Sequence, residues 1–535
     1  MQKEHIYLYD TTLRDGQQTL GVDFNSEEKT LIANALSSLG LDYIEGGFPG
    51  ANPTDTNFFA QDPDYGSSKL TAFGMTRRAG RSASNDPGLA ALLDSRAQAI
   101  CVFGKTWDLH VEVALGISNE ENLAAIADTL SHIAADGREA LFDCEHFFDG
   151  YKANRDFALA CAKTAYENGA RWVVLCDTNG GTLSNEIEDI VRDVMKVVPG
   201  DHLGIHCHDD TGQAVANSLA AVRAGVRQIQ GTLNGLGERC GNANLTTIIP
   251  TLMLKPTFSD RFTVSVTHEQ LKNLTYASRT LDEVLNRAPD RSAAYVGDRA
   301  FSHKGGIHVS AVQKNPKTYE HVLPELVGNR RRMLVSDQAG KSNIIAELER
   351  LNIKIDKNDP RIGKMLQQVK AQEAEGYAYE GADASFELLA RRILFGVPEF
   401  YKVEHYRVLV ERRYNALGHQ VNVSEATVKV TVHGKTYISA AEGNGPVNAL
   451  DIALRKDLGQ YSPHIKNLEL VDYKVRILNG GTEAVTRVLI ESRDETGSRW
   501  MTVGVSSNIV DASFAALSDS ITYKLIRDQA PIAAQ

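Results

Sequence analysis

The first part of the chain alternates between short apolar runs and longer amphipathic segments. Eight runs are rich in β-branched and aromatic residues and have the length of buried strands. These runs are residues 6–10, 43–47, 70–74, 99–104, 140–145, 172–177, 203–208 and 228–235. Segments with a helical spacing of apolar residues lie between them, so the pattern predicts a repeated strand–helix unit.

Residues 25–40 illustrate the helical signal. Asn25 can cap the amino end of a helix, and Glu28 completes a capping box three residues later. Gly40 is suited to end the same helix. The spacing predicts one apolar stripe, formed by Leu31, Ala35, Leu36 and Leu39.

Eight strands, each followed by a helix, within residues 1–285 are typical of a (β/α)8 TIM barrel. A doubly wound open sheet is the alternative. The barrel is favoured because the count is eight and because no Gly-x-Gly-x-x-Gly fingerprint follows the first strand. We therefore predict an α/β fold class with a catalytic barrel at the amino end.

The pattern changes twice after the barrel. Residues 286–402 are irregular and helical, which indicates a linker with one or two small helical subdomains. Residues 403–535 alternate like half-buried antiparallel strands and then turn helical, and this order occurs twice. Two strand–strand–strand–helix units predict an internally duplicated α+β domain, for which dimerisation and ligand sensing are the two interpretations.

Composition and charge narrow the class of protein. A chain of 535 residues has the length of several domains, and its net charge of −11 argues against a nucleic-acid partner. The six cysteines are too few for a secreted disulfide scaffold, so we expect reduced buried thiols and a cytoplasmic protein. No apolar run approaches the roughly 20 residues of a membrane helix, and the amino end lacks a signal-peptide core.

Functional side chains of a TIM barrel gather at the carboxyl ends of its strands. His206 and His208 lie two residues apart on the seventh predicted strand, so both face the same side. Two imidazoles and a carboxylate can hold a divalent cation, and Asp15 ends the first strand, next to the eighth in a closed barrel. Two hydrogen-bonded core histidines are the alternative. Their place at a strand end, with Asp15 and Asn242 converging, favours the metal site.

Three further polar residues follow predicted strands. We expect Gln18 to form hydrogen bonds within the site, and Asp143 shares a strand face with Glu145 and is expected to line a substrate pocket. Glu45 also lies at a strand end, but a capped turn explains it nearly as well.

Three motifs carry a family resemblance. Together, "DTTLRDGQQ", "HCHDDTG" and "NGLGERCGNANL" resemble the acyl-CoA-condensing barrel family of 2-isopropylmalate, homocitrate and citramalate synthases. The segments "YIEGGFPGANPTDTNFF" and "AAEGNGPVNALDIAL" are most similar to the citramalate synthase branch. The resemblance covers essentially the whole chain.

The resemblance implies a role for individual residues. It implies a divalent metal (Mg²⁺, Mn²⁺, Co²⁺ or Zn²⁺) on Asp15, His206 and His208, with Asn242 as a weaker fourth contact. It implies that Arg14 lies beside the substrate carbonyl and that Thr178 binds the carboxylate of the 2-oxo acid. The implied catalytic residues are Arg14, Glu145, His308 and Tyr319. The segment that holds His308 and Tyr319 is implied to reach the active site of a partner subunit, so a homodimer is expected.

The reaction that the resemblance implies joins acetyl-CoA to pyruvate, with thioester hydrolysis, and yields citramalate and CoA for isoleucine biosynthesis through 2-oxobutanoate. His308, oriented by Glu145, is a candidate base, and either residue can play the larger part. Isoleucine is the expected effector at the carboxyl-terminal domain. The alternatives are an isopropylmalate or homocitrate synthase that uses a larger 2-oxo acid, a metal-dependent acyl-CoA lyase, and a non-enzymatic amino-acid sensor.

Overall fold

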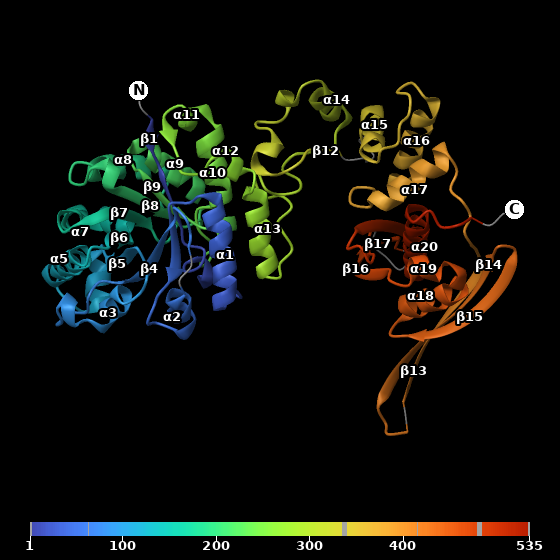
Figure 1. The fold of residues 1–535 in the computed structure, drawn as a ribbon, viewed down its shortest axis with the longest axis horizontal. Helices are drawn as coiled ribbons and strands as arrows, with labels where there is room; N and C mark the ends of the chain where they lie inside the picture. The colour runs from blue at the N-terminus through green and yellow to red at the C-terminus, as the bar shows by residue number, and fades with distance from the viewer. Residues whose placement is uncertain (1–2, 62–63, 334–339, 415, 479–483, 533–535) are drawn as a thin grey trace. The chain divides into compact units, whose positions relative to one another are not determined.

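The computed structural model describes residues 3–61, 64–333, 340–414, 416–478 and 484–532 (Figure 1). The chain divides into two compact units. The first comprises Met1–Phe301 and His321–Arg331, and the second comprises Ser302–Glu320 and Arg332–Gln535.

The first unit contains a closed barrel of eight parallel strands, which confirms the predicted (β/α)8 fold and excludes the open sheet. The strands are β2 (Tyr7–Asp10), β3 (Tyr43–Gly47), β4 (Lys69–Met75), β5 (Ala99–Lys105), β6 (Glu139–Glu145), β7 (Ala170–Asp177), β8 (Leu203–Cys207) and β9 (Gln228–Gly231). Closure joins β2 to β9, which pair in parallel from Tyr7↔Gln228 to Asp10↔Gly231. The segment after β2 and the segments after β8 and β9 therefore end at the same mouth.

Helices alternate with these strands and surround the barrel (Figure 1). They are α1 (Ser26–Leu39), α2 (Pro53–Ala60), α3 (Pro87–Leu93), α5 (Asn119–Ala135), α6 (Phe147–Ala153), α7 (Arg155–Glu167), α8 (Ser184–Val194), α9 (Ala214–Ala224) and α10 (Leu245–Leu254). Two short strands, β1 (Glu4–His5) and β10 (Phe262–Thr263), pair with each other outside the barrel, and α13 (Leu274–Val284) packs against α1.

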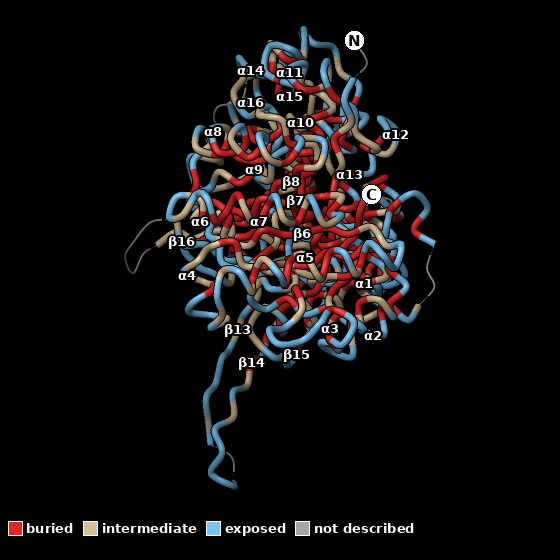
Figure 2. The backbone as a smooth tube through the Cα atoms, turned by 90° about the vertical axis from the view of Figure 1, so that its left-hand side faces the viewer, coloured by how far each residue is buried: buried red, intermediate tan, exposed pale blue. Residues whose placement is uncertain are grey.

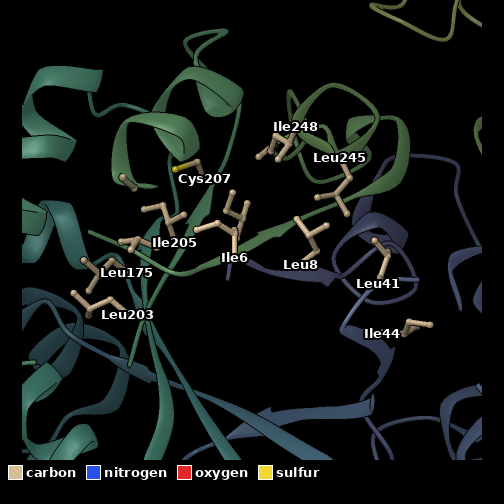
Figure 3. Close-up of a cluster of buried hydrophobic side chains, with 14 of the residues drawn as sticks. Ile6, Leu8, Leu41, Ile44, Leu175, Leu203, Ile205, Cys207, Leu245 and Ile248 are labelled. Carbon is tan, nitrogen blue, oxygen red and sulfur yellow. The ribbon is translucent and has the colours of Figure 1, made fainter. Parts of the chain in front are cut away.

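Alternation along each strand produces two packed layers. Outward residues such as Leu175 and Ile205 meet the helices in one apolar cluster (Figure 3). Inward residues form a separate cluster that fills the barrel interior. That cluster is Tyr9, Tyr43, Ala99, Cys101, Leu141, Trp172, Val174 and Cys176. Because the interior is filled there, a substrate can enter only at the open carboxyl ends of the strands.

The helix α1 has the predicted ends but a different buried face. Asn25 and Glu28 form the capping box, and Gly40 ends the helix in the left-handed conformation with φ +81°. Leu31, expected in the apolar stripe, is 51% exposed, so that part of the prediction is wrong. The buried face instead comprises Lys29, Ile32, Ala33, Leu36 and Leu39. The helix is rotated toward Lys29 because that ammonium group meets polar partners beneath it.

The second unit begins with a short parallel pair, β11 (Ser302–His303) and β12 (Arg332–Met333). Four helices of the described chain lie between Ser302 and Lys402, the first of them between β11 and β12. They are α14 (Gly306–Lys314), α15 (Lys341–Arg350), α16 (Pro360–Ala374) and α17 (Asp383–Leu394). The last three share an apolar core of their own, which agrees with the helical subdomain expected in this region.

The carboxyl-terminal part contains the predicted duplication. One antiparallel sheet has the order β13 (Lys402–Tyr414), β14 (Gln420–Val432), β15 (Lys435–Gly443), and α18 (Pro446–Asp457) covers it. The other has the order β16 (Glu469–Ile477), β17 (Thr486–Arg493), β18 (Arg499–Ser506), and α20 (Ile509–Arg527) covers it.

All six cysteines are free; five are buried, as expected, but Cys240 is exposed. Among the described residues, none of the helices combines the length and the apolar character that crossing a bilayer demands.

Candidate active site

A cavity of about 230 Å³ opens at the carboxyl ends of the barrel strands. It is lined by Arg14, Asp15, Gln18, Phe73, Phe103, Asp143, Glu145, Cys176, Thr178, His206, His208 and Glu238. Every site residue predicted within the barrel is in this set except Asn242, which contacts Asp15 directly. The barrel therefore brings side chains from several strand ends to one place.

Asp15, His206 and His208 converge as a buried triad. The Nε2 atoms of the two imidazoles are 3.3 Å apart. They lie 3.8 Å and 4.0 Å from Oδ2 of Asp15, for His206 and His208 respectively. One ligand atom from each residue falls within 4.8 Å of the others, which suits a single divalent ion.

Asn242 supplies a further oxygen beside this triad. Its Nδ2 donates to Oδ1 of Asp15 at 2.7 Å and to the carbonyl of Leu236 at 3.0 Å. Its Oδ1 is buried and has no hydrogen-bond partner among the described residues. An orphaned buried acceptor is costly unless a cation or water completes it, so this amide fits the fourth contact.

The charge states of the triad suit a cation. Burial opposes ionisation of Asp15, but Arg14 and the two imidazoles outweigh it and lower the pKa of Asp15 to about 2. Burial, reinforced by the neighbouring His206, lowers the pKa of His208 to about 4. A carboxylate and a neutral imidazole are the forms that bind metal, so the residues present fit a divalent ion.

Arg14 is held rigidly at the edge of the cavity. Its Nε donates to Glu45 at 2.7 Å, its Nη1 donates to Asp15 at 2.8 Å, and its guanidinium lies 3.7 Å from the centre of the Phe73 ring. Burial alone would lower the pKa of Arg14, but the two carboxylates keep this pKa above its ordinary value. The group is thus a fixed positive charge.

Glu45 is the strand-end acid for which the sequence left a capped turn as the alternative. It is fully buried and accepts hydrogen bonds from Tyr9, Thr11 and Arg14. The capped turn considered for Glu45 is therefore wrong: its carboxylate is the buried partner of the guanidinium. Its position at the end of β3, beside β2, was the only signal in the sequence.

Thr178 is arranged to donate a hydrogen bond into the cavity. Its hydroxyl oxygen accepts the backbone N–H of His146 at 2.9 Å. That N–H is directed by the left-handed conformation of His146, with φ +53°. Since the oxygen is already engaged as an acceptor, the hydroxyl hydrogen is available to an acceptor in the cavity, and binding of a carboxylate there stays a prediction.

The predicted acids of β6 have different environments. Glu145 forms an ion pair with Lys105. Asp143 is buried, and burial raises its pKa to about 6. Oδ1 of Asp143 accepts a hydrogen bond from Nε2 of Gln230 at 3.0 Å, a contact that the sequence reasoning also missed.

His308 and Tyr319 belong to the second unit, whereas Glu145 belongs to the first. The two rings lie with their centres 4.3 Å apart; His308 is exposed in the first turn of α14, and Tyr319 follows the short turn Pro316–Thr318. Nearby, His303 contacts Glu320 at 3.1 Å. The structure thus pairs His308 with Tyr319 but leaves their combination with Glu145 a prediction.

Lys29 supports the loop that carries Arg14 and Asp15. It is fully buried, and its Nζ donates to the carbonyls of Leu13 at 2.8 Å and Gly46 at 2.9 Å and pairs with Asp55. A lysine in an amphipathic helix is ordinarily expected on the solvent-exposed face. No signal in the sequence therefore indicated that Lys29 is buried and supports this loop.

Three known protein families match consecutive segments of the chain. Residues 5–278 match the family described as HMGL-like. Residues 295–376 match "Homocitrate synthase post-HMGL domain-like", and residues 380–525 match "LeuA allosteric (dimerisation) domain".

Curated relatives cover the chain from end to end. The (R)-citramalate synthase of Aquifex aeolicus is 49% identical over 531 residues, which are 98% of this chain and 99% of that protein. The (R)-citramalate synthase of Geobacter sulfurreducens is 50% identical over 528 residues, 98% of each chain. A 2-isopropylmalate synthase of Aquifex aeolicus is 31% identical over 536 residues, 98% of this chain and 97% of that one.

Proposed function

This chain belongs to the (R)-citramalate synthases of the HMGL-like family, and we propose that it joins the methyl carbon of acetyl-CoA to the ketone carbon of pyruvate. Water then cleaves the thioester and releases citramalate and CoA. The product would serve isoleucine biosynthesis through 2-oxobutanoate.

The relatives carry the choice of 2-oxo acid, because the two (R)-citramalate synthases are 49% and 50% identical to this chain and the 2-isopropylmalate synthase is 31% identical. The cavity beside the metal triad has a volume of about 230 Å³. Phe73 and Phe103 stack with ring centres 5.5 Å apart and form one wall of it. A methyl group suits such a wall better than the isopropyl group of 2-oxoisovalerate.

The charge of the cavity argues against 2-oxoglutarate. Among the described residues that line the cavity, Arg14 is the one cation, and Glu45 and Asp15 already hold it. The second carboxylate of 2-oxoglutarate would face Asp143 and Glu238 instead, and like charges repel.

Each step of the reaction is assigned to particular residues of the chain. Thr178 would donate its free hydroxyl hydrogen to the carboxylate of pyruvate and orient the ketone. Arg14 would stabilise the oxyanion that develops on the ketone oxygen. A divalent ion held by Asp15, His206 and His208 would supply Lewis-acid polarisation of that carbonyl. We assign removal of a methyl proton from acetyl-CoA to His308, with Glu145 as the acid that orients it.

The proposal is tested by offering the purified chain acetyl-CoA, Mg²⁺ or Mn²⁺, and one 2-oxo acid at a time, while free CoA thiol is measured. We expect release with pyruvate at a kcat/KM at least about 100-fold above that for 2-oxoisovalerate or 2-oxoglutarate, since a crowded pocket and an unpaired carboxylate each cost several kcal/mol. Preference for a larger acid would make the chain an isopropylmalate or homocitrate synthase. No thiol release with any acid would remove the synthase class.

We extend the proposal to a homodimer formed through the carboxyl-terminal domain. The edge strand β13 and its neighbour β14 run beyond β15. Residues 411–414 pair with 420–423, and no other described strand pairs with them there. Val410 and Tyr414 are 61% and 74% exposed on this hairpin, and most of its outer part is exposed (Figure 2). An isolated two-stranded ribbon is only marginally stable in water. We therefore expect the same domain of a second copy to pack against this hairpin.

We also propose that isoleucine acts as a feedback effector on this domain. A cavity of about 620 Å³ lies between β13 and the start of α20. Its apolar wall is formed by Val408, Val510 and Phe514. Two carboxylates, those of Glu404 and Asp511, also line it. This combination matches a branched side chain and an ammonium group.

Filling that cavity is expected to relieve inhibition. Val510→Trp should raise the isoleucine concentration for half-inhibition at least about tenfold and leave the uninhibited rate unchanged, because each 1.4 kcal/mol of lost binding is tenfold. Val471→Trp, a partly exposed site outside the cavity, is the control for added bulk. Deleting the residues after 400 should abolish the inhibition, and a truncated enzyme that isoleucine still inhibits would contradict the assignment.

A further inference from the structure

Three side chains form a buried hydrogen-bonded chain across the barrel interior. Nε2 of Gln230 donates to Oδ1 of Asp143 at 3.0 Å, and Oε1 of Gln230 lies 2.8 Å from Nδ1 of His206. All three residues are at most 4% exposed. His206 and Gln230 are register partners on the neighbouring strands β8 and β9, whereas β6 and β9 are not neighbours, so the amide of Gln230 links this strand pair across the interior to Asp143.

The chemistry of the amide fixes the direction of this chain. A carboxylate accepts hydrogen bonds, so the NH₂ group of Gln230 must face Asp143. The amide oxygen then faces His206, and only a protonated Nδ1 can donate to it. His206 is therefore held as the Nδ1–H tautomer, with a lone pair on Nε2.

That lone pair points where a cation is needed. Nε2 of His206 is the atom 3.3 Å from Nε2 of His208 and 3.8 Å from Oδ2 of Asp15. His208 differs, since its Nδ1 is buried with no hydrogen-bond partner among the described residues. The protein thus preorganises one imidazole of the pair and leaves the other without an outer partner.

We propose that Gln230 is a positioning residue that sets the tautomer and ring orientation of His206 for metal binding and ties this imidazole to Asp143 in the substrate cavity. The inference rests on the metal site of the proposed function. Outer partners of ligating histidines commonly contribute 10–100-fold to metal affinity.

The same strand offers a matched control. Gln228 lies two residues before Gln230 on β9, so both side chains face the barrel interior. Gln228 is also fully buried, but neither atom of its amide has a hydrogen-bond partner among the described residues. Gln228→Met and Gln230→Met therefore make the same change on the same face of the same strand, and only the second removes a contact to His206.

The test measures the Mn²⁺ dissociation constant of the full-length chain by the electron paramagnetic resonance of free Mn²⁺, with no substrate present. Gln230→Met should weaken binding about 10–100-fold, while Gln228→Met stays within about threefold of the unsubstituted chain. Gln230→Glu should restore affinity to within about threefold, because a buried carboxyl group beside Asp143 holds a proton. Its O–H then donates to Asp143 as the NH₂ group did, and its carbonyl oxygen still accepts the Nδ1–H of His206.

Equal affinities of Gln230→Met and the unsubstituted chain would overturn the positioning role alone. The same would follow if Gln228→Met weakened binding as much as Gln230→Met, or if Gln230→Glu failed to restore it. An unsubstituted chain that bound no Mn²⁺ would instead overturn the metal site of the proposed function, and this inference with it. Since no 2-oxo acid is used, the substrate preference does not affect the result.

Discussion

His208→Ala is expected to weaken Mn²⁺ binding more than about 100-fold and to reduce condensation at least about 1,000-fold. A direct ligand contributes more than the 10–100-fold of an outer partner, and the carbonyl to be attacked loses its Lewis acid. His208 supplies one of three converging ligand atoms, and its other ring nitrogen has no hydrogen-bond partner among the described residues. The effect should therefore act through the cation and not through the fold.

His202→Ala is the matched control for that experiment. His202 lies at the opposite end of β8, where its Nδ1 contacts the carbonyl of Arg171 at 3.0 Å. It should retain metal affinity and turnover, and both variants should unfold at temperatures close to that of the unsubstituted chain. Normal Mn²⁺ binding by His208→Ala would refute its assignment as a ligand.

Arg14→Lys is expected to lower kcat about 100- to 1,000-fold while metal affinity changes by less than about threefold. Loss of one preorganised oxyanion donor typically costs about 2.7–4 kcal/mol of transition-state stabilisation. Lysine is chosen over alanine because it keeps a positive charge beside Glu45, which is fully buried and would otherwise lack its ionic partner. The planar fork toward Glu45 and Asp15 is lost, and with it the fixed position of the charge.

A second arginine on the same barrel serves as the control. Arg171 lies over the ring of Trp172 at 3.8 Å, much as Arg14 lies over Phe73 at 3.7 Å, but it is at the start of β7. Arg171→Lys should leave kcat and KM unchanged. If Arg14→Lys raised KM and left kcat intact, Arg14 would bind the substrate and the transition state equally strongly. Its role in stabilising the transition state would then be refuted.

The order of the elements was predictable because the signals are local. The alternation in residues 203–208 predicted β8, and the cap at Asn25 predicted the start of α1. Capping and the periods of 2 and 3.6 residues depend on neighbours within one or two turns. The buried face of α1 could not be predicted from the sequence in the same way. Exposure of Leu31 and burial of Lys29 depend on which polar groups lie beneath the helix.

The partners of the site residues needed the folded barrel. Arg14 and Glu45 are 31 residues apart in sequence, and they meet because β2 pairs with β3 in the register Tyr9↔Tyr43. Strand register is set by closure and packing of the whole sheet, which no local pattern encodes. The same holds for Lys29, whose carbonyl partners lie in the turn after β2 and in β3.

The amino-acid sequence by itself determined where strands and helices begin and which side chains share a face, since backbone geometry repeats over a few residues. It thereby placed His206 and His208 on one side of β8, at a strand end. Only the tertiary structure decided which inward side chains meet, as Asp143, Gln230 and His206 do from three strands. Distances across a barrel follow from its closure and stagger, which are properties of all eight strands together.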